Sequence, residues 1–270
     1  MAEHIYTVAS KKKTELNDRK SREGVRARGG ALKLGHPTAA SRLPVSSASH
    51  IASRALSLES VMDLASEILW PERRREDPDE IYDVDAGRAQ EYSLLAMLLS
   101  RSPDAATLGR IAALRGDATS LGLAHLALAE AATNASVERI AREYFTLFIG
   151  IGRGKLLPYG SYYLTGFLNE RPLARLREDL RAHGIERAEG QTEPEDHAAT
   201  LCEIMAGMTN GQFPVTDRMQ QRFFEKHLAS WIGRFFVDLE RAEAAEFYRH
   251  VGALGRLFLE TEAAAFTLLT

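Results

Sequence analysis

The sequence predicts an all-α fold, a helical globule of roughly ten helices. Ala and Leu together supply 73 of the 270 residues, whereas Val and Ile supply only 20. Ala and Leu lose little side-chain freedom in a helix, while β-branched residues favour strands. Apolar residues recur at three- and four-residue spacing from residue 56 onward, and no stretch shows the alternation typical of a strand.

The predicted helices of the first half share apolar residues three or four positions apart. They lie at about 56–70, about 87–99, from 102–104 onward, about 121–132, and from Asn134 or Ser136 to 148. Pro71 ends the first of them, because proline lacks the N–H that a helix interior needs. Residues 121–132 are almost all apolar, so we expect that helix to lie at the centre of the fold.

The second half begins after a glycine-rich break at residues 150–160. Pro172 opens a helix that Gly184 closes, since proline is tolerated in a first turn and glycine at a helix end. Residues 184–193 are polar and read as a linker. From Val215 to Thr270 the chain has no proline and is expected to form two or three long helices.

The residues after this linker resemble a helix start. Thr192 is placed as the N-cap, with Pro194 in the first turn and Glu195 as the capping-box partner. Asp196 and His197 would then stand in the first turn. Their plain interpretation is a carboxylate that complements the helix dipole beside a half-buried histidine. Their functional interpretation is a titratable cluster at a hinge, where ligands often bind.

Charge divides the chain in two. Residues 1–55 carry a net charge of +7, and residues 56–270 carry −10. Only one of the 21 aromatic residues lies in the first segment, so 1–55 is expected to be a basic, disordered extension. A tail that binds nucleic acid or mimics a leader peptide is the alternative. No apolar stretch follows its basic residues, so an export signal is not predicted and a cytoplasmic location is expected.

Motifs for catalysis are weak. Gly150–Lys155 resembles a phosphate-binding loop, but Leu156 stands where that motif requires lysine. The histidines lack metal-site spacing, and the single Cys202 excludes a disulfide. Asp196, His197 and Glu203 leave a small hydrolase open as an alternative, without an oxyanion hole or an activated nucleophile. Aromatic and basic residues alternate over 221–236, at a helical spacing that favours core packing over base stacking.

Three blocks of residues, in this order and spacing, carry a resemblance. They are 144–150 continued by 157–163, the Glu-Pro-Glu-Asp-His run 193–197 followed by 203–205, and Phe224-x-x-His227-Leu228-x-x-Trp231 followed by 247–248 and Glu260. Together they are similar to the TorD/DmsD family of chaperones for molybdenum-containing redox enzymes. The resemblance spans roughly residues 56–266. Leu201 and Ile204 depart from it, standing where the family usually has glutamate and phenylalanine.

The resemblance implies a TorD-like chaperone domain over 56–270, made of two helical parts joined by a hinge at about 184–193. It implies a cytoplasmic protein without catalysis that binds the apo form and the twin-arginine leader of a molybdopterin-dependent oxidoreductase, and delays export until the cofactor is inserted. Formate dehydrogenase and S- or N-oxide reductases are plausible clients. A leader-independent assembly factor for a membrane-bound nitrate reductase-type enzyme is the alternative. Family members also include weak binders of guanine nucleotides, monomers and swapped dimers.

By the same resemblance, Asp196 and His197 line the leader-binding cleft near the hinge. The other residues implied in leader or client binding are Tyr144, Phe148, Pro158, Ser161, Tyr162, Glu193, Glu203, His227 and Trp231. The residues themselves add one argument. A body of charge −10 attracts a leader that carries two arginines, and arginine prefers carboxylate partners. The apolar stretch of the leader would then lie in a groove between helices. No metal and no tightly bound cofactor are expected.

Overall fold

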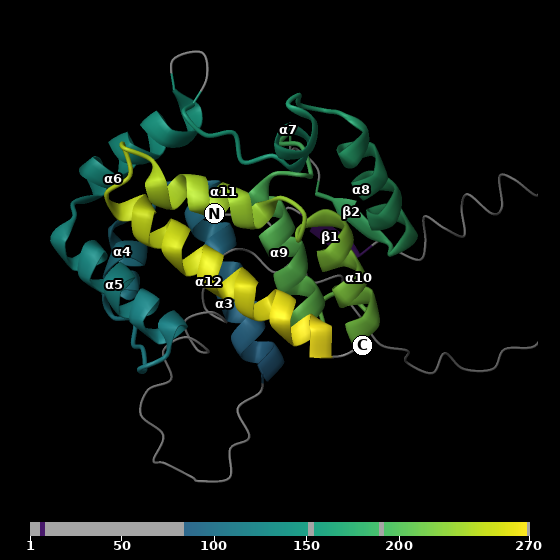
Figure 1. The fold of residues 1–270 in the computed structure, drawn as a ribbon, viewed down its shortest axis with the longest axis horizontal. Coiled ribbons are helices and arrows are strands. Elements are labelled where there is room, and N and C mark those ends of the chain that lie inside the picture. The colour runs from purple at the N-terminus through teal and green to yellow at the C-terminus, as the bar shows by residue number, and fades with distance from the viewer. Residues whose placement is uncertain (1–5, 9–83, 151–153, 189–191, 269–270) are drawn as a thin grey trace, which may run out of the picture.

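A computed structural model describes residues 6–8, 84–150, 154–188 and 192–268. These residues form ten α-helices, one π-helical turn and two short strands, which confirms the all-α class (Figure 1). The α-helices are α3 Val84–Ser100, α4 Ala105–Ala112, α5 Ser120–Asn134, α6 Val137–Tyr144, α7 Gly160–Thr165, α8 Arg171–Ala182, α9 Ala198–Thr209, α10 Asp217–His227, α11 Ile232–Arg241 and α12 Phe247–Leu268. The other elements are β1 Tyr6–Val8, the π-helical η1 Phe145–Ile149 and β2 Ile185–Arg187. The helix predicted at 56–70 lies outside the described residues.

The centre of the fold is α9, in which every residue except Glu203 is buried. Its many small side chains allow neighbouring helices to approach closely. Helix α3 packs along α9, and the long helix α12 packs against α11, α5 and α3 (Figure 1). The prediction that residues 121–132 are central was wrong. In α5, Leu123 and Leu126 remain 56% and 42% exposed, because apolar content alone does not show which apolar helix lies innermost.

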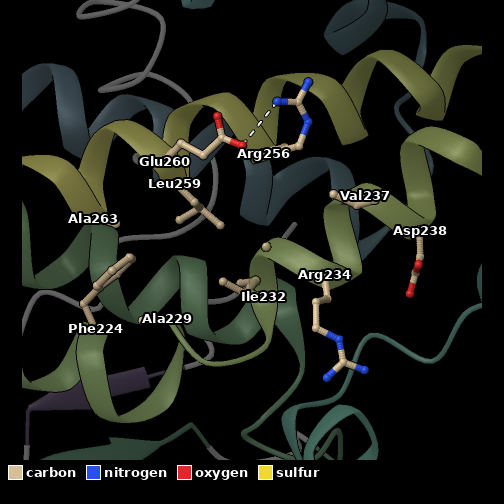
Figure 2. Close-up of a pocket in the computed structure, with 11 residues that line it drawn as sticks. Phe224, Ala229, Ile232, Arg234, Val237, Asp238, Arg256, Leu259, Glu260 and Ala263 are labelled. Carbon is tan, nitrogen blue, oxygen red and sulfur yellow. Dashed lines mark hydrogen bonds and ion pairs between the residues drawn. The ribbon is translucent and has the colours of Figure 1, made fainter.

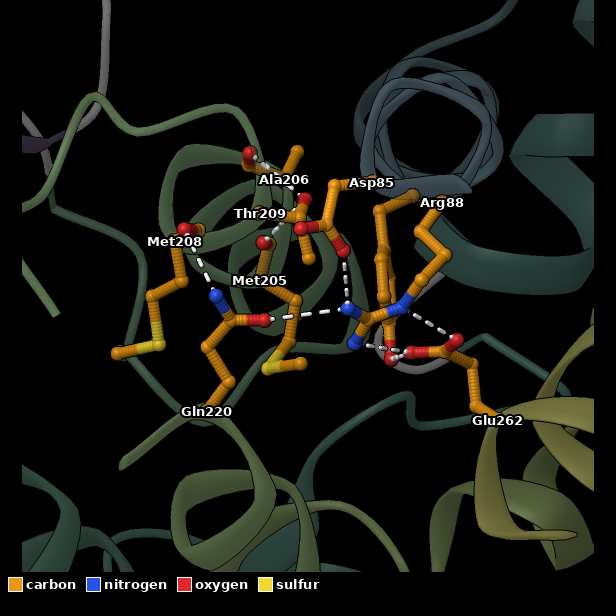
Figure 3. Close-up of polar contacts among 9 residues, drawn as sticks. Asp85, Arg88, Met205, Ala206, Met208, Thr209, Gln220 and Glu262 are labelled. Carbon is orange, nitrogen blue, oxygen red and sulfur yellow. Dashed lines mark hydrogen bonds and ion pairs between the residues drawn. The ribbon is translucent and has the colours of Figure 1, made fainter. Parts of the chain in front are cut away.

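A buried polar network joins the first described helix to the last one (Figure 3). Arg88 of α3 donates from Nε to Glu262 Oε1 of α12 at 2.7 Å and from Nη2 to Oε2 at 3.0 Å. The Tyr92 hydroxyl donates to the same Oε2 at 2.9 Å. Arg88 also donates to Asp85 and to Gln220 of α10. Glu262 is only 2% exposed, so removing its carboxylate from water is costly. The donors of Arg88 and Tyr92 offset this cost, because they satisfy both carboxylate oxygens.

Two strands correct the expectation of a chain without β-structure. Strand β1 pairs antiparallel with β2, and Thr7 lies opposite Glu186. Part of the segment 1–55, expected to be disordered, is therefore paired, and part of the expected linker 184–193 is a strand. A three-residue strand is too short to show alternation, and its partner lies almost 180 residues away, so no local pattern signals the pair.

Several helix boundaries follow local sequence signals, and one does not. Ser136 caps α6 by accepting from the Arg139 N–H, and Pro172 lies in the first turn of α8, as predicted. The predicted helix start at Thr192 was wrong. Helix α9 begins at Ala198, where His197 is the N-cap and its Nδ1 accepts from the Ala199 N–H at 3.1 Å. The expected helices after Val215 are α10, α11 and α12.

Candidate functional site

Two segments that are distant in the sequence meet where α7 begins. The backbone of 158–160 runs antiparallel to that of 196–198, through two hydrogen bonds of 2.7 and 2.9 Å. The Asp196 carboxylate continues this contact, since Oδ2 accepts from the Ser161 N–H at 2.7 Å. The structure thus brings together residues from two of the blocks that the sequence singled out. Asp196 precedes α9, whereas the prediction placed it inside that helix.

A cavity of about 100 Å³ lies beside this contact. Asp196 is 3% exposed, and its second oxygen, Oδ1, has no hydrogen-bond partner. The Ser161 hydroxyl is likewise buried without a partner. A buried carboxylate oxygen without a donor is costly, and a cavity of this size admits water or the end of a side chain. The cavity is lined by Gly160, Leu164, Pro172, Arg175, Leu176, Asp196, Leu201, Lys226, His227 and Trp231.

The connection between α10 and α11 forms one wall of this cavity. The Trp231 indole N–H donates to the His227 carbonyl at 2.7 Å. His227 Nε2 lies 2.6 Å from Asp179 Oδ2 of α8, and burial lowers the pKa of His227 although Asp179 opposes this. A side chain at Gly160 would place its Cβ 3.0 Å from Trp231 Nε1. A Cβ at this position would be an unusually close contact, so the indole would have to move by a few tenths of an ångström.

A side-chain hydrogen bond also joins the two segments that meet where α7 begins. The Tyr159 hydroxyl donates to the carboxylate of Glu193, which is exposed. Burial, and then Glu193, raise the pKa of Tyr159. Burial also raises the pKa of Tyr144 to about 12, and the charge of Glu193 adds to this increase. Tyr144 on α6 therefore lies within electrostatic range of Glu193.

His197 is neutral at physiological pH. Burial lowers its pKa to about 4, and the neighbouring charge of Asp196 offsets only part of this effect. Its Nδ1 accepts the Ala199 N–H, so the proton of the neutral ring is on Nε2. The ring lies edge-on to that of Tyr159, with centroids 5.0 Å apart. The ring of His197 is therefore uncharged near pH 7, and the functional interpretation of Asp196 and His197 as a cluster at a hinge stays a prediction.

The other predicted site residues lie at varying distances from the cavity. Phe148 packs on Tyr144 and on Tyr248 of α12, with ring centroids 5.0 and 5.4 Å apart. Tyr162 lines a different hollow on the opposite side of α7. Glu203 is half-buried on α9. The structure therefore groups Pro158, Ser161, Glu193, Asp196, His197, His227 and Trp231, while the remaining predicted residues surround this group.

A larger hollow of about 440 Å³ lies between α11 and α12 (Figure 2). Its apolar side chains are Phe224, Ala229, Ile232, Val237, Leu259 and Ala263. Its charged lining includes Arg234 and the ion pair between Arg256 Nη1 and Glu260 Oε1 at 3.3 Å. Gly233 also lines it, and a Cβ there would meet nothing within 4 Å. The hollow and the cavity lie on either side of the α10–α11 connection.

Sequence reasoning missed several residues of the site. Glu195 lies next to Asp196, but Arg177 of α8 binds its Oε2 at 2.7 Å, and Arg187 of β2 lies 3.8 Å from its Oε1. Both contacts fix the loop before Asp196, and no local spacing predicts them. Tyr159 and Gly160 lie inside a block that the sequence singled out. The Gly160–Ser161 step, directly after a proline and a tyrosine, was the available signal for a close backbone approach.

Comparisons with known proteins agree with this architecture. A profile of the family described as nitrate reductase delta subunit matches residues 115–237. The chain is 28% identical over 132 residues to chaperone protein TorD of Vibrio cholerae, which covers 46% of this chain and 60% of that relative. It is 25% identical over 192 residues to TorD of Vibrio vulnificus, covering 63% and 89%. It is 28% identical over 119 residues to the Tat proofreading chaperone DmsD of Haemophilus influenzae, covering 43% and 57%.

These matches and the all-helical fold indicate the class of helical redox-enzyme chaperones. The family model and the curated relatives support assignment of the matched region to the TorD/DmsD family. The aligned part of the chain spans about 60% of the length of the first of these relatives. A solved chain from Archaeoglobus fulgidus aligns with 70% of this chain and 99% of its own length at 23% identity, and its TM-score of 0.46 is too low to support an argument.

Two further observations concern the described residues alone. None of their helices is long and apolar enough to cross a membrane. Within the same residues, no group of three or more His, Cys, Asp or Glu side chains is placed to hold a metal ion.

Proposed function

We propose that this chain is a cytoplasmic maturation chaperone that binds the apo form and the twin-arginine leader of a molybdenum-containing oxidoreductase. Its relatives are named chaperones, and one is named a Tat proofreading chaperone. The observation that carries the proposal is Asp196 Oδ1, a buried acceptor without a donor at the edge of a cavity. A leader arginine supplies the missing donor.

The neighbouring carboxylates show why Asp196 is singled out. Glu195 is satisfied by Arg177, and Glu193 accepts from the Tyr159 hydroxyl. Asp196 uses only one of its oxygens, for the Ser161 N–H. A guanidinium donates through a planar fork that fits a carboxylate, and such charge-assisted bonds are about twice as strong as neutral ones. Glu193 is exposed, and we propose that it receives the second arginine.

The apolar stretch of the leader needs a second, larger surface. The hollow between α11 and α12 supplies it, because six apolar side chains line it (Figure 2). The α10–α11 connection contributes to both spaces, since Ala229 lines the hollow and Trp231 lines the cavity. An amphipathic helix typically binds in a groove of this kind. The net charge of −10 over residues 56–270 attracts the basic end of the leader, and salt weakens this attraction.

Titration of the full chain with a synthetic twin-arginine leader tests the role of Asp196. In Asp196→Asn the acceptor for the Ser161 N–H remains while the charge is lost, and we expect affinity to fall by about tenfold or more. Glu178→Gln is the matched control, since this exposed carboxylate lies on α8 outside the cavity. Equal affinities of Asp196→Asn and the unmodified chain would refute the arginine contact.

Gly233→Phe tests the apolar part of the proposal. Gly233 lines the hollow and its Cβ position has nothing within 4 Å, so the new side chain takes up space in the hollow. We expect leader affinity to fall while the free energy of unfolding stays within about 1 kcal/mol of its original value. A leader shortened in its apolar stretch should bind both proteins alike. Full affinity of Gly233→Phe for the intact leader would place the apolar stretch elsewhere.

The alternatives make different predictions. A leader-independent assembly factor for a nitrate reductase-type enzyme would bind its client equally well without a leader. A hydrolase is disfavoured because Asp196 and His197 are both engaged in capping helices. A tail that binds nucleic acid would lose DNA retention on removal of residues 1–55, whereas leader binding persists. Retention of one molybdoenzyme precursor on the tagged full chain would identify the client, for example formate dehydrogenase or an S- or N-oxide reductase.

A further inference from the structure

The turn between α7 and α8 exposes three large apolar side chains. Leu164 is 43% exposed, Phe167 69% and Leu168 42%. We call residues 164–168 the apolar turn. Figure 1 shows that it lies at the outer edge of the molecule, at the top of the view. Exposed apolar side chains that stand singly are common, whereas three within five residues form a patch that indicates an interaction.

The backbone presents these side chains in a defined conformation. Gly166 ends α7 with φ 83°, and Asn169 has φ 60°, the single positive value outside glycine among the described residues. The Thr165 hydroxyl donates to the Ser161 carbonyl at 2.8 Å and accepts from the Phe167 N–H at 3.2 Å. Asparagine adopts the left-handed region more readily than other non-glycine residues. Gly166 and Asn169 thus allow the chain to turn at both ends of a segment in which Phe167 is 69% exposed.

Cations surround the apolar turn, although the body as a whole is acidic. Arg171 follows it at the start of α8, and Arg175 lines the same cavity as Leu164. Lys155 and Arg234 line the hollow on the other side, together with Gly166. All four side chains are exposed. Arg234 lies over the Tyr163 ring, and Asp238 accepts from the hydroxyl of that ring. The surface around Phe167 is thus apolar at its centre, and its edge carries these four cations against the two exposed carboxylates of Glu170 and Asp238.

We propose that the apolar turn inserts into the surface of an anionic lipid bilayer. Aromatic and leucine side chains enter the boundary between headgroups and acyl chains, while lysine and arginine bind the phosphates around them. The turn is convex, whereas a surface that binds a peptide is usually a groove. An acidic partner protein would need a pocket of its own for Phe167, while a lipid surface adapts to a protruding side chain. Three side chains and four cations make a weak, reversible contact.

Co-sedimentation of the full chain with vesicles tests this proposal. We expect binding to mixed phosphatidylcholine and phosphatidylglycerol vesicles, weaker binding to pure phosphatidylcholine, and a decrease at high salt. Phe167→Ser removes the most exposed apolar group and should weaken binding by about tenfold. Arg171→Gln should weaken it by about fivefold. Both residues are exposed at the surface, so neither change disturbs the core.

The matched control is Leu123→Ser, which removes an equally exposed leucine from α5, away from the turn. It should bind vesicles like the unmodified chain. The basic residues 1–55 are present in every variant, so they do not account for a difference between variants. Equal binding by Phe167→Ser and the unmodified chain would overturn the proposal. Leader affinity is measured in parallel and should be unchanged in Phe167→Ser, so failure here is distinguishable from failure of the leader-binding proposal.

Discussion

Two buried carboxylates, Glu262 and Asp196, are used in opposite ways. Both oxygens of Glu262 accept hydrogen bonds, from Arg88 and from Tyr92. Asp196 accepts one bond from the Ser161 N–H, and its Oδ1 has no partner. The two residues are 2% and 3% exposed, so burial does not distinguish them. What differs is the set of donors that the fold provides.

This difference separates a structural role from a binding role. A carboxylate whose donors are complete stabilises the contact between α3 and α12 and has no capacity left for a ligand (Figure 3). A carboxylate with an unused oxygen facing a cavity is available to a donor from outside the chain. The predictions below test this contrast through the free energy of unfolding, in decreasing order of expected effect.

The largest effect is expected for Glu262→Gln. It leaves the guanidinium of Arg88 buried with an incomplete partner, which should lower the free energy of unfolding by about 3–5 kcal/mol. Asp85→Asn is the control, since Asp85 contacts the same arginine but its side chain is 50% exposed, and it should cost less than about 1 kcal/mol. Urea unfolding measures both. If both variants lower the free energy of unfolding by a similar amount, Glu262 contributes no more to stability than the exposed Asp85.

Acid should destabilise the folded chain through His197. The pKa of His197 is about 4 in the folded chain. In the unfolded chain the pKa of this histidine is about 6.5. As the pH falls below about 6.5, the unfolded state therefore binds a proton before the folded state does. The free energy of unfolding decreases over this range, down to about pH 4. The loss amounts to about 3 kcal/mol. His197→Asn keeps an N-cap without a titrating group. Its stability should depend less on pH over this range, and an unchanged profile would contradict the prediction.

Two glycines near the candidate site give the next contrast. Gly160→Ala places a Cβ 3.0 Å from the Trp231 indole nitrogen and should cost about 1–3 kcal/mol. Gly233→Ala meets nothing within 4 Å and lies inside α11, so it should stabilise the chain by up to about 1 kcal/mol. Thermal unfolding measures both. A loss of stability in Gly233→Ala would show that the space beside α11 is not free.

The smallest effect is expected for the capping bond of Asp196 itself. Asp196→Ala removes the acceptor of the Ser161 N–H and should cost about 1 kcal/mol. Asp196→Asn keeps this acceptor and should be close to neutral in stability. The pair separates the capping role from the proposed arginine contact, which both substitutions remove. A larger loss in Asp196→Asn than in Asp196→Ala would reverse this assignment.

Much of the fold could be predicted because its signals are local. The stripes of α3 and of α10 to α12, the cap at Ser136 and the proline of α8 each depend on residues within one or two turns. The start of α9 was misplaced because Thr192 and His197 are both possible caps, and the choice is made by backbone pairing with 158–160. The β1–β2 pair and the central place of α9 likewise depend on contacts distant in sequence.

The candidate site likewise contains residues that the sequence indicates and residues that only the fold brings near. Asp196 and Ser161 were found because they lie in recognisable blocks of sequence. Arg177 and Asp179 have no such signal, since they contact the site from α8 only after the chain has folded. No sequence pattern predicts that Oδ1 of Asp196 lacks a hydrogen-bond partner, because this depends on which donors the folded chain brings near the carboxylate.

The pairing of β1 with β2 has a consequence for oligomerisation. Strand β2 lies a few residues before Asp196, and Arg187 within it contacts Glu193 and Glu195. A chain trimmed to remove its first residues would leave β2 as an open edge strand. Open edges pair with other chains. Trimming would therefore favour association between copies along β2.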